Sequence, residues 1–482
     1  MIEIAYPSSF EQRVLALEGP GGPPARVGLV APTITTPGRC FTLKVALHDE
    51  AAFPSVEYDG AVRIRADFAR PSEFEVPFRK GRPAVAAVHG VAIESEGMFR
   101  FQAELDGKTF HANPTRCMDN PAHFIYWGDP HVHTVISRCH PAKCRSLNFC
   151  YVAGRHLAGL DWVTAADHVS NGRSDLGKWK EQIAASEVFN DPEHFVTLPG
   201  YEVSLKGGAG GDTNPYILRW TDMFVDEYEE GTARTLCEKL AAQLAEGEFF
   251  VVPHHTTRTG KHGEIPEEIY PGPERMPVVE ITSRWGTSEY RGNPNPLKKI
   301  HPGPSYVVDL LNQGLMLGFI GGTDTHATMP ALHAGGDNPN IDRFPGLTAV
   351  KADRLTRENV FHGIRTRNCY AASLERVYID ETIASAPGGS KLAWADPTRP
   401  REIQVAAAAQ SDIVSIDVVR NGRTIHSASP DNWLAGLAFT DAENLPDACL
   451  ESKHLGRFVY YYVRVTCRSG AQGWSSPVWL VL

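Results

Sequence analysis

The sequence predicts an α/β protein in which a barrel-like middle region is flanked on both sides by β-sandwich-like regions. Three observations lead to this fold class. The chain has 482 residues, which is more than one ordinary hydrophobic core accommodates. Short runs of alternating apolar and polar residues occupy both ends of the chain, whereas strands alternate with amphipathic helices in the middle. We therefore expect three domains, at residues 1–118, 119–375 and 376–482.

Residues 1–118 have the pattern of short β-strands. Alternating runs at 39–49, 61–68 and 98–105 are separated by turns rich in glycine and proline, and strong helical periodicity is absent. This pattern predicts a β-sandwich, although alternation alone does not separate a sandwich from a barrel.

The middle region reads as strands alternating with helices, the pattern of a parallel sheet built from βα units. Strands are predicted at 124–130, 161–168, 194–204, 248–255, 276–283, 315–326 and 346–352. Helices are predicted at 146–159, 233–247, 305–314 and 356–368, and Gly159 and Gly247 are suited to end the first two. The number of strands suggests a TIM-like barrel.

The C-terminal region returns to alternating strands, at 401–410, 413–428 and 458–470. The Asn421-Gly422 pair favours a tight turn between two of these strands. We expect a second β-sandwich-like domain.

Composition excludes several classes of function. The formal net charge of −10 argues against a nucleic-acid polymer as partner, because such polymers are held mainly by lysine and arginine contacts to phosphate. The N-terminal segment lacks a basic stretch followed by an apolar run, and about 18 consecutive apolar residues occur nowhere, so neither a signal peptide nor a membrane span is expected. Nine irregularly spaced cysteines favour reduced thiols and a cytoplasmic location.

Nearly every predicted strand of the middle region ends in a residue type that ligates metals. In an α/β barrel the C-terminal strand ends form the rim on which active sites lie. The residues are Asp129, His131, His133, Asp167, His168, Glu202, His254, His255, Glu280, Asp324 and His326.

The spacing within these groups is consistent with shared ions. Side chains alternate faces along a strand, so His131 and His133 point the same way, as do Asp324 and His326. If the strand continues through His254 and His255, they point to opposite faces, so that one is a ligand and the other lines the pocket; alternation does not choose between them. Each residue alone also has an ordinary structural explanation, such as a helix cap or an Asx turn at Asp324. The concurrence of several strand ends favours a metal centre.

These residues lie in segments that resemble the polymerase and histidinol phosphatase (PHP) superfamily of metal-dependent phosphoesterases. The matching segments are, in the family's order, GDPHVHT, AADH, LPGYE, VVPHH, VVEIT and GGTDTH. Within that superfamily the chain is similar to the group known as DUF3604, through residues 200–217, 280–290, 346–373 and 460–480.

The resemblance implies a distorted (β/α)7 barrel of PHP type with two or three divalent ions of manganese, iron or zinc. A first ion would be held by His131, His133, Glu202 and Asp324. Glu202 would bridge to a second ion, which His254 or His255 and Glu280 complete. A third would use His168, His326 and His140, with Cys139 as a bystander. Imidazole and carboxylate ligands suit these metals. A separate zinc site built from Cys139, Cys144 and Cys150 is disfavoured, since they lack paired C-x2-C spacing.

Two neighbouring cations lower the pKa of a shared water and so generate a metal-bridged hydroxide as nucleophile. Asp129 or Asp167 would orient a ligand histidine or carry a proton. Arg284 shares a strand face with Glu280 if the strand runs on, which would place a guanidinium at the mouth for an anionic group. Alternative cations with the same role are Arg138, Lys143, Arg145, Arg258 and Lys261.

The predicted function is therefore that of an enzyme, a metal-dependent hydrolase of phosphoesterase type that acts on a small phosphate mono- or diester. One alternative keeps the metal centre but directs it at a non-phosphate ester, an amide or a lactone, or at an elimination. The other is a non-catalytic glycan-binding protein in which the metal is structural.

Overall fold

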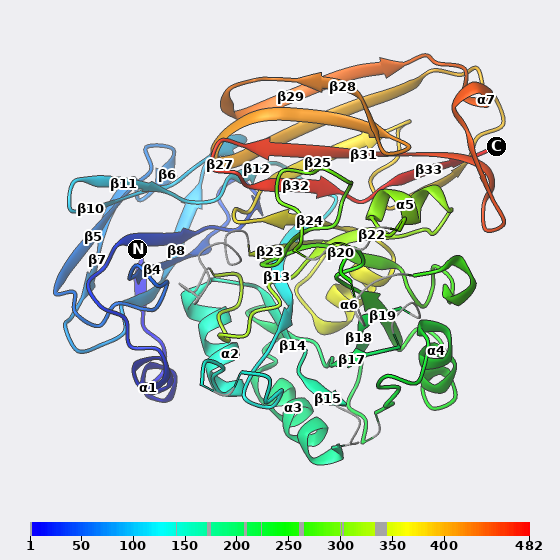
Figure 1. The fold of residues 1–482 in the computed structure, drawn as a ribbon. Helices are drawn as coiled ribbons and strands as arrows, with labels where there is room; N and C mark the ends of the chain where they lie inside the picture. The colour runs from blue at the N-terminus through cyan, green and yellow to red at the C-terminus, as the bar shows by residue number, and fades with distance from the viewer. Residues whose placement is uncertain are drawn as a thin grey trace.

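The computed structural model describes residues 2–140, 142–170, 175–206, 210–222, 224–259, 265–298, 300, 303–332 and 345–482. Figure 1 shows three parts: an N-terminal group of strands, a middle part that contains most of the helices, and a large C-terminal sheet. None of the helices in these ranges is long and apolar enough to cross a membrane.

The N-terminal part consists of two main antiparallel sheets around one apolar core. Alternation along the strands gives each sheet a buried face, and residues such as Val45, Val62 and Val88 share the core between them. The first sheet contains β1 (Glu3–Ala5), β8 (Val85–Ile93), β4 (Phe41–His48) and β2 (Arg26–Val30), with β6 (Ala69–Arg70) beside β8. The second contains β11 (Lys108–His111), β10 (Gln102–Leu105), β5 (Gly60–Arg65) and β7 (Glu73–Phe78). A small third sheet joins β3 (Ile34–Thr35), β12 (Thr115–Cys117) and β9 (Gly97–Phe99).

This part also contains a helix that the sequence pattern does not predict, α1 (Ser9–Glu18). A capping box begins it: Ser8 Oγ accepts from the Glu11 amide at 3.3 Å, and Glu11 Oε2 accepts from the Ser8 amide at 2.8 Å. Val14 and Leu15 of α1 pack against Phe149 of the middle part. The helix therefore joins the N-terminal sheets to the region that carries the site.

The strands of the middle part fall into three hydrogen-bonded sheets. The first contains β16 (Val196–Thr197), β14 (Trp162–Ala165), β13 (Phe124–Val132), β23 (Gly346–Ala352) and β24 (Cys369–Ser373). The second contains β15 (His168–Ser170), β17 (Glu202–Ser204), β18 (Asp212–Ile217) and β19 (Phe249–Pro253). The third contains β21 (Gly286–Thr287), β20 (Val278–Ser283) and β22 (Gly318–Gly321). No closed ladder surrounds these strands in the described ranges, and the (β/α)7 barrel stays a prediction.

Helices accompany these strands, mostly where the sequence pattern places them. They are α2 (Leu147–Val152), the π-helix η1 (Ala153–Leu157), α3 (Leu176–Phe189), α4 (Ala233–Ala241), the 3₁₀-helix η2 (Glu267–Ile269), α5 (Val307–Asn312) and α6 (Arg357–Arg365). The strand β13 approaches its neighbour β14 closely at Gly128, where a Cβ atom would lie 2.1 Å from the Trp162 indole. Glycine at this position thus allows the strand that carries His131 to pair with β14.

The C-terminal part is continuous with the first sheet of the middle part. Its elements are β25 (Tyr378–Ile383), β26 (Lys391–Ala393), β27 (Arg401–Arg420), β28 (Arg423–Ala428), β29 (Asn432–Asp441), α7 (Leu445–Ala448), β30 (Leu450–Ser452), β31 (Gly456–Cys467), β32 (Gln472–Ser475) and β33 (Val478–Val481). Strand β24 pairs with β32 from Tyr370 to Ser373. Hydrogen bonds therefore cross the position at 375/376 where the sequence pattern places a domain boundary, because alternation marks a strand but not its partner.

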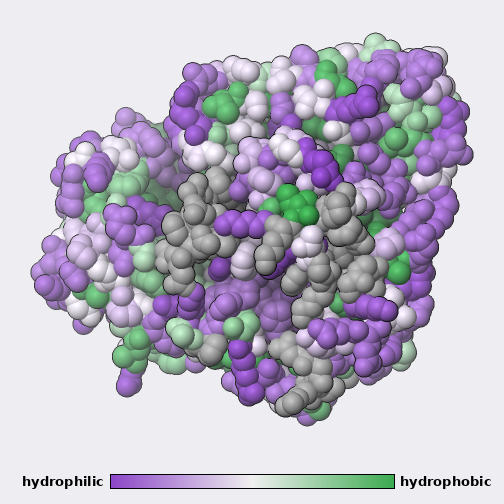
Figure 2. Space-filling view, viewed as in Figure 1, coloured by the Kyte–Doolittle hydropathy of each residue, from purple (hydrophilic) through white to green (hydrophobic). Residues whose placement is uncertain are grey.

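The surface shown in Figure 2 is mostly hydrophilic, with hydrophobic residues in small separate groups. Such scattered apolar residues are normal on a folded domain.

Candidate metal centre

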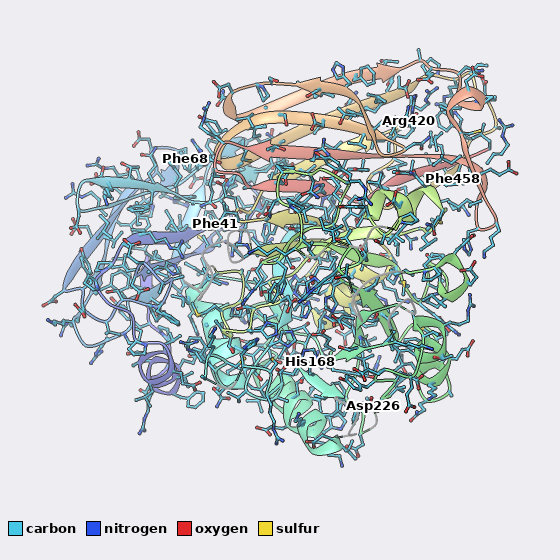
Figure 3. The ribbon with its side chains drawn as sticks, viewed as in Figure 1. Phe41, Phe68, His168, Asp226, Arg420 and Phe458 are labelled. Atoms are coloured by element: carbon cyan, nitrogen blue, oxygen red, sulfur yellow. The ribbon has the colours of Figure 1, made fainter. Side chains whose placement is uncertain are left out.

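Seven histidine and carboxylate side chains converge in the middle part, and none is more than 4% exposed. They come from the ends of strands β13, β19 and β22, from β20, and from the start of β17. The residues are His131, His133, Glu202, His254, His255, Glu280 and Asp324. Figure 3 shows the neighbouring His168 within the middle part, away from Phe41 and Phe68 of the N-terminal sheets and from Arg420 and Phe458 of the C-terminal sheet.

Glu202 lies between two sets of imidazole nitrogens. Its Oε2 atom is 3.3 Å from His131 Nε2 and 3.1 Å from His133 Nε2. Its Oε1 atom is 3.3 Å from His254 Nε2. Each oxygen of this carboxylate therefore faces a different set of nitrogen donors, as expected for a carboxylate shared by two ions.

Asp324 is the second carboxylate at the centre of the cluster. Its Oδ1 atom is 3.0 Å from His133 Nε2, and its Oδ2 atom is 2.7 Å from His255 Nε2. On the other side, His131 Nδ1 is 3.0 Å from Glu280 Oε2. The histidines and carboxylates thus form one continuous network.

The ligand atoms gather in overlapping groups, and within each group all atoms lie within 4.8 Å of one another. The groups are His131–His133–Asp324, His131–His254–Glu280, His254–His255–Asp324, Glu202–Asp212–His254 and His133–Cys139–His168–His326. The first four groups are buried and the last is partly exposed, and groups of this composition could hold divalent metal ions.

Two further observations fit a metal centre. Both ring nitrogens of His254 are buried, and among the described residues neither has a well-formed hydrogen bond, since Nε2 approaches Glu202 Oε1 only to 3.3 Å. Such orphaned nitrogens are costly unless an ion binds them. In addition, a Cβ atom at Gly322 would lie 2.5 Å from Glu280 Oε2 and 2.8 Å from the His131 Cβ, so only glycine lets these two side chains approach.

The cluster strongly perturbs the pKa values of its members. Burial opposes protonation of His131, but Asp324, Glu280 and Glu202 outweigh burial and raise the pKa of His131 well above its usual value. The same balance, with Asp324 and Glu202, raises the pKa of His133 to about 10. Burial alone would raise the pKa values of Glu202 and Asp324, yet the surrounding histidines hold both well below the usual range. Glu202 and Asp324 are therefore ionised and can bind cations.

Asp129 does not face the ligand atoms but holds the backbone that carries them. Its Oδ1 atom accepts from the amides of His131 and Thr323, both at 3.0 Å. Its Oδ2 atom accepts from the Thr323 hydroxyl at 2.6 Å and from the Ala331 amide at 3.0 Å. Burial raises the pKa of Asp129 to about 6 despite these hydrogen bonds. This residue ties the end of β13 to the segment after β22, which carries Asp324.

Asp167 orients His133 through Ser137. The Ser137 hydroxyl donates to Asp167 Oδ1 at 2.6 Å and lies 3.0 Å from His133 Nδ1. Because the serine proton is directed to Asp167, His133 Nδ1 is the donor in its contact with Ser137. Nε2 is then the nitrogen of His133 that faces Glu202 and Asp324 and that would bind an ion, in exchange for its proton.

The structure places both His254 and His255 at the site, and which of them binds an ion stays a prediction. Strand β19 ends at Pro253, and His255 has a left-handed backbone with φ of 54°. Strand alternation therefore does not apply to this pair, whose rings lie 4.7 Å apart.

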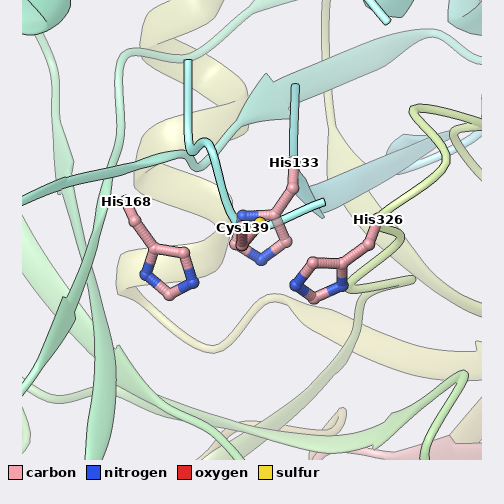
Figure 4. A group of neighbouring side chains, drawn as sticks. All are labelled: His133, Cys139, His168 and His326. Atoms are coloured by element: carbon pink, nitrogen blue, oxygen red, sulfur yellow. The ribbon is translucent and has the colours of Figure 1, made fainter. Parts of the chain in front are cut away.

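At the partly exposed side of the cluster the structure groups a different set of side chains from the predicted third set of ligands. Cys139, which the sequence interpretation treats as a bystander, joins His133, His168 and His326, whereas His140 is absent from the groups of the described residues. The His140 ring stands edge-on to that of His326 with the centroids 4.9 Å apart. Figure 4 shows His168 and His326 on either side of His133.

Arg284 lies just beyond the end of β20 rather than within the strand. Its guanidinium lies over the Trp285 ring at 4.7 Å, and that of Arg258 lies over the same ring at 5.3 Å. The indole in turn packs edge-on against His255 and His326, with centroid distances of 6.1 and 5.9 Å. Trp285 therefore holds two guanidinium groups beside the cluster.

The other candidate cations differ in their surroundings. Arg145 Nη1 donates to the carbonyl of Ala327 at 2.7 Å, and its guanidinium lies over Phe53, so it holds the loop rather than facing the ligand atoms. Arg138 is exposed and has a positive φ of 57°. Lys143 is exposed, and Lys261 lies outside the described residues.

Asp212 is a candidate ligand that the sequence interpretation did not select. It begins strand β18, which runs antiparallel to both β17 and β19, and it groups with Glu202 and His254. The sequence interpretation considered the C-terminal ends of strands, whereas an antiparallel strand presents its N-terminal end to the same edge. A carboxylate opening the partner strand of a hairpin that carries Glu202 is the signal that could have identified it.

Comparison with known proteins gives relatives of unassigned function. No family model matches the chain. It is similar to an uncharacterised protein of Chlamydia pneumoniae, with 26% identity over 400 residues, covering 80% of this chain and 62% of that protein. A protein of Chlamydia trachomatis is 27% identical over 403 residues with the same coverage, and one of Chlamydia muridarum is 30% identical over 308 residues, covering 61% of this chain and 48% of that protein. The chain thus spans less than two thirds of the length of these relatives.

Solved structures show only weak likeness. A Bacteroides uniformis β-glucuronidase is similar with a TM-score of 0.21 at 8% identity, covering 94% of this chain and 61% of that one. A Salmonella α-2-macroglobulin is similar with a TM-score of 0.17 at 8% identity, covering 96% of this chain and 24% of that one. Such low scores indicate neither a shared fold nor a shared function.

Proposed function

We propose that this protein is a metal-dependent hydrolase that acts on a phosphate mono- or diester of a small molecule. The observation that carries this proposal is the position of Glu202, whose two carboxylate oxygens face different sets of imidazole nitrogens, His131 with His133 on one side and His254 on the other. Two divalent ions that share one carboxylate are a common arrangement for hydrolysis of phosphate esters. The ordered PHP-like segments of the sequence point to the same chemistry.

The residues that would hold a first ion are His131, His133, Glu202 and Asp324. Those that would hold a second are Glu202 with His254 and with Glu280 or Asp212. When bound, such ions supply Lewis acidity, which activates water at neutral pH and neutralises negative charge that develops on phosphate oxygens. Manganese, iron and zinc are all compatible with these donors.

The remaining residues would act by orientation and by charge. Asp167 and Ser137 keep a proton on His133 Nδ1 and so keep Nε2 directed inward. Asp129 fixes the two backbone segments that carry the ligands. Arg284 and Arg258, held by Trp285, would bind the anionic group of the substrate, since a guanidinium donates two parallel hydrogen bonds to phosphate.

The partial exposure of two histidines beside the buried ligands favours a small substrate. The side chains of His168 and His326 are 17% and 13% exposed, whereas the ligands behind them are buried. A phosphate group would therefore enter past these two histidines and past Trp285, with the rest of the molecule toward solvent.

The proposal is tested by turnover of p-nitrophenyl phosphate and bis-p-nitrophenyl phosphate by protein loaded with manganese, iron or zinc. We expect activity with at least one ion, and its reduction to background in Glu202→Gln, which keeps the size of the side chain but removes the charge. Glu451→Gln, an exposed change in the C-terminal sheet, is the matched control and should keep full activity.

Other outcomes separate the alternatives. Turnover of p-nitrophenyl acetate without turnover of either phosphate would replace the phosphoesterase with a hydrolase of another ester. Tight binding of ions without turnover of any ester would reject the hydrolase, and would favour a structural metal.

A further inference from the structure

We propose that Cys139 is a thiolate ligand of the third ion position, together with His168 and His326, and that this position selects zinc over manganese. The inference rests on the proposed metal centre and adds to it the identity of one donor and the class of ion. It replaces the histidine that the sequence resemblance implies at this place with a sulfur.

The geometry assigns Cys139 rather than His140 to this position. The ligand atoms of His133, Cys139, His168 and His326 all lie within 4.8 Å of one another. Figure 4 shows the rings of His168 and His326 flanking that of His133, with Cys139 beside the His133 ring. In a tetrahedral zinc site the donors are about 3.5 Å apart, so contraction by about 1 Å would complete the site.

The local fold explains why position 139 reaches these histidines. After β13 the chain turns back on itself, since the Ser137 amide donates to the Thr134 carbonyl at 3.2 Å and the Arg138 amide to the Val135 carbonyl at 3.3 Å. Arg138 then takes a left-handed backbone, with φ of 57°. The chain is thereby reversed immediately before Cys139, which brings its sulfur back toward His133.

His133 belongs to the first ion and not to the third. Its Nδ1 atom lies 3.0 Å from the Ser137 hydroxyl and its Nε2 atom 3.0 Å from Asp324 Oδ1, so both nitrogens are engaged elsewhere. The third position therefore has one sulfur and two nitrogens from the protein. Three protein ligands leave the fourth place of a tetrahedral zinc for water or substrate, as in catalytic rather than structural zinc sites.

The donor set determines which ion is preferred. A thiolate is a soft ligand that suits zinc, whereas manganese prefers carboxylate, carbonyl and water oxygens. The buried positions have carboxylates and histidines alone, so they accept either ion. We therefore expect a centre with two kinds of position, of which the exposed one is specific for zinc.

Cobalt provides a direct readout of the sulfur ligand, because Co²⁺ replaces zinc and a cobalt–thiolate bond gives an intense charge-transfer band in the near ultraviolet. Ion-free protein is titrated with Co²⁺, with far-ultraviolet circular dichroism to check folding. The wild-type chain should develop this band, and Cys139→Ser should lose it and bind one ion fewer. His140→Ala should keep the band.

Cys40→Ser is the matched control for the thiol, because Cys40 is an exposed free cysteine of the N-terminal part. This variant should retain the band. Zinc should then bleach the cobalt band at a concentration at least about tenfold below the manganese concentration that does so.

The outcomes separate this inference from the proposed function. A wild-type chain that binds Co²⁺ without the band, or a band that survives in Cys139→Ser, overturns the sulfur ligand. Equal displacement by manganese overturns the selectivity. If the chain binds no Co²⁺ at all, the metal centre itself is rejected, whereas a band without turnover of any ester leaves the ligand assignment standing and rejects only the hydrolase.

Discussion

A single hydroxyl group connects three parts of the candidate site. Ser137 Oγ donates to Asp167 and accepts from the backbone amide of His168 at 3.0 Å, while His133 Nδ1 donates to it. The hydrogen-bonding capacity of the serine is then fully used. The orientation of His133 and the backbone position of His168 therefore depend on the same atom.

Removal of this hydroxyl should weaken ion binding without removing any ligand. In Ser137→Ala, His133 loses the acceptor for Nδ1–H, so we expect about 10- to 100-fold lower affinity for the first ion, as found when outer hydrogen-bond partners of ligands are removed. Ion competition against a fluorescent chelator measures this change. Ser137→Thr, which keeps the hydroxyl, should recover most of the affinity; equal loss in both variants would contradict the orienting role.

Substitution of Gly322 should also disturb the site, for steric reasons. A methyl group there would meet Glu280 Oε2 at 2.5 Å, so Gly322→Ala should displace the carboxylate and cost about 1–3 kcal/mol of stability. Chemical denaturation and ion binding would both report the change. Gly22, where an added Cβ meets no described atom within 4 Å other than those of its chain neighbours, provides the control substitution to alanine; similar effects at the two positions would argue against the steric explanation.

The sequence was informative about candidate ligands that lie within, or shortly after, a strongly apolar strand. His131, Glu280 and Asp324 could be predicted for that reason. Cys139 could not, because its position depends on a tight turn and a left-handed residue before it. Asp212 was missed because only the C-terminal ends of strands were considered, whereas it begins an antiparallel strand.

At the scale of elements, the predicted helices are those with a clear apolar face, and the helices not predicted lack one. Helix α1 buries only Val14 and Leu15, and α3 buries the polar residues Gln182 and Ser186 beside Trp179 and Ile183. Gln182 is tolerated there because its amide donates to the carbonyls of Ala165, at the end of β14, and of Gly200, between β16 and β17. Contacts with residues distant in sequence thus stabilise these two helices, and a local pattern does not reveal such contacts.

Acid should destabilise the region around helix α1, because Glu11 becomes protonated. Burial alone would raise the pKa of Glu11, but hydrogen bonds from His156 and Ser8 outweigh it and lower the pKa from 4.5 to about 2. In the window between these values the unfolded chain binds the extra proton, so stability conferred by Glu11 is complete above about pH 4.5 and is lost as the pH falls toward 2.

The Glu11→Gln variant tests this contribution. Relative to wild type it should be less stable by about 1–2 kcal/mol at pH 7, and the difference should shrink as the pH falls through this window. Urea unfolding at a series of pH values measures it. A difference that stays constant with pH would show that the Glu11 charge is not involved.

At the scale of the whole molecule, a buried carboxylate joins the middle part to the C-terminal sheet. Glu289 is 1% exposed; its Oε1 atom accepts from Tyr462 and Arg464, both at 2.7 Å, and its Oε2 atom accepts from the Trp474 indole at 2.8 Å. The three donors all come from β31 and β32. Because of this network and the β24–β32 pairing, we expect the described residues between 124 and 482 to behave as one structural unit.

Loss of this carboxylate should therefore lower the stability of that whole unit. In Glu289→Ala the buried Arg464 keeps only Asp417 as acidic partner among the described residues, and we expect a loss of about 3–5 kcal/mol. Thermal unfolding should show one transition for this unit in both proteins, shifted down in the variant. Glu451→Ala, on the exposed side of β30, should leave the midpoint unchanged; a separate transition for the C-terminal sheet would contradict the single unit.

The pairing of β24 with β32 also determines how the chain tolerates shortening. A protein that stops at residue 375 would retain all the candidate ligands, yet one edge of β24 would have open amide and carbonyl groups from Tyr370 to Ser373. Exposed strand edges of this kind recruit other chains. The shortened protein should accordingly self-associate into insoluble aggregates. The C-terminal sheet would thus be needed first for solubility, by covering the edge of β24, and not for the chemistry of the site.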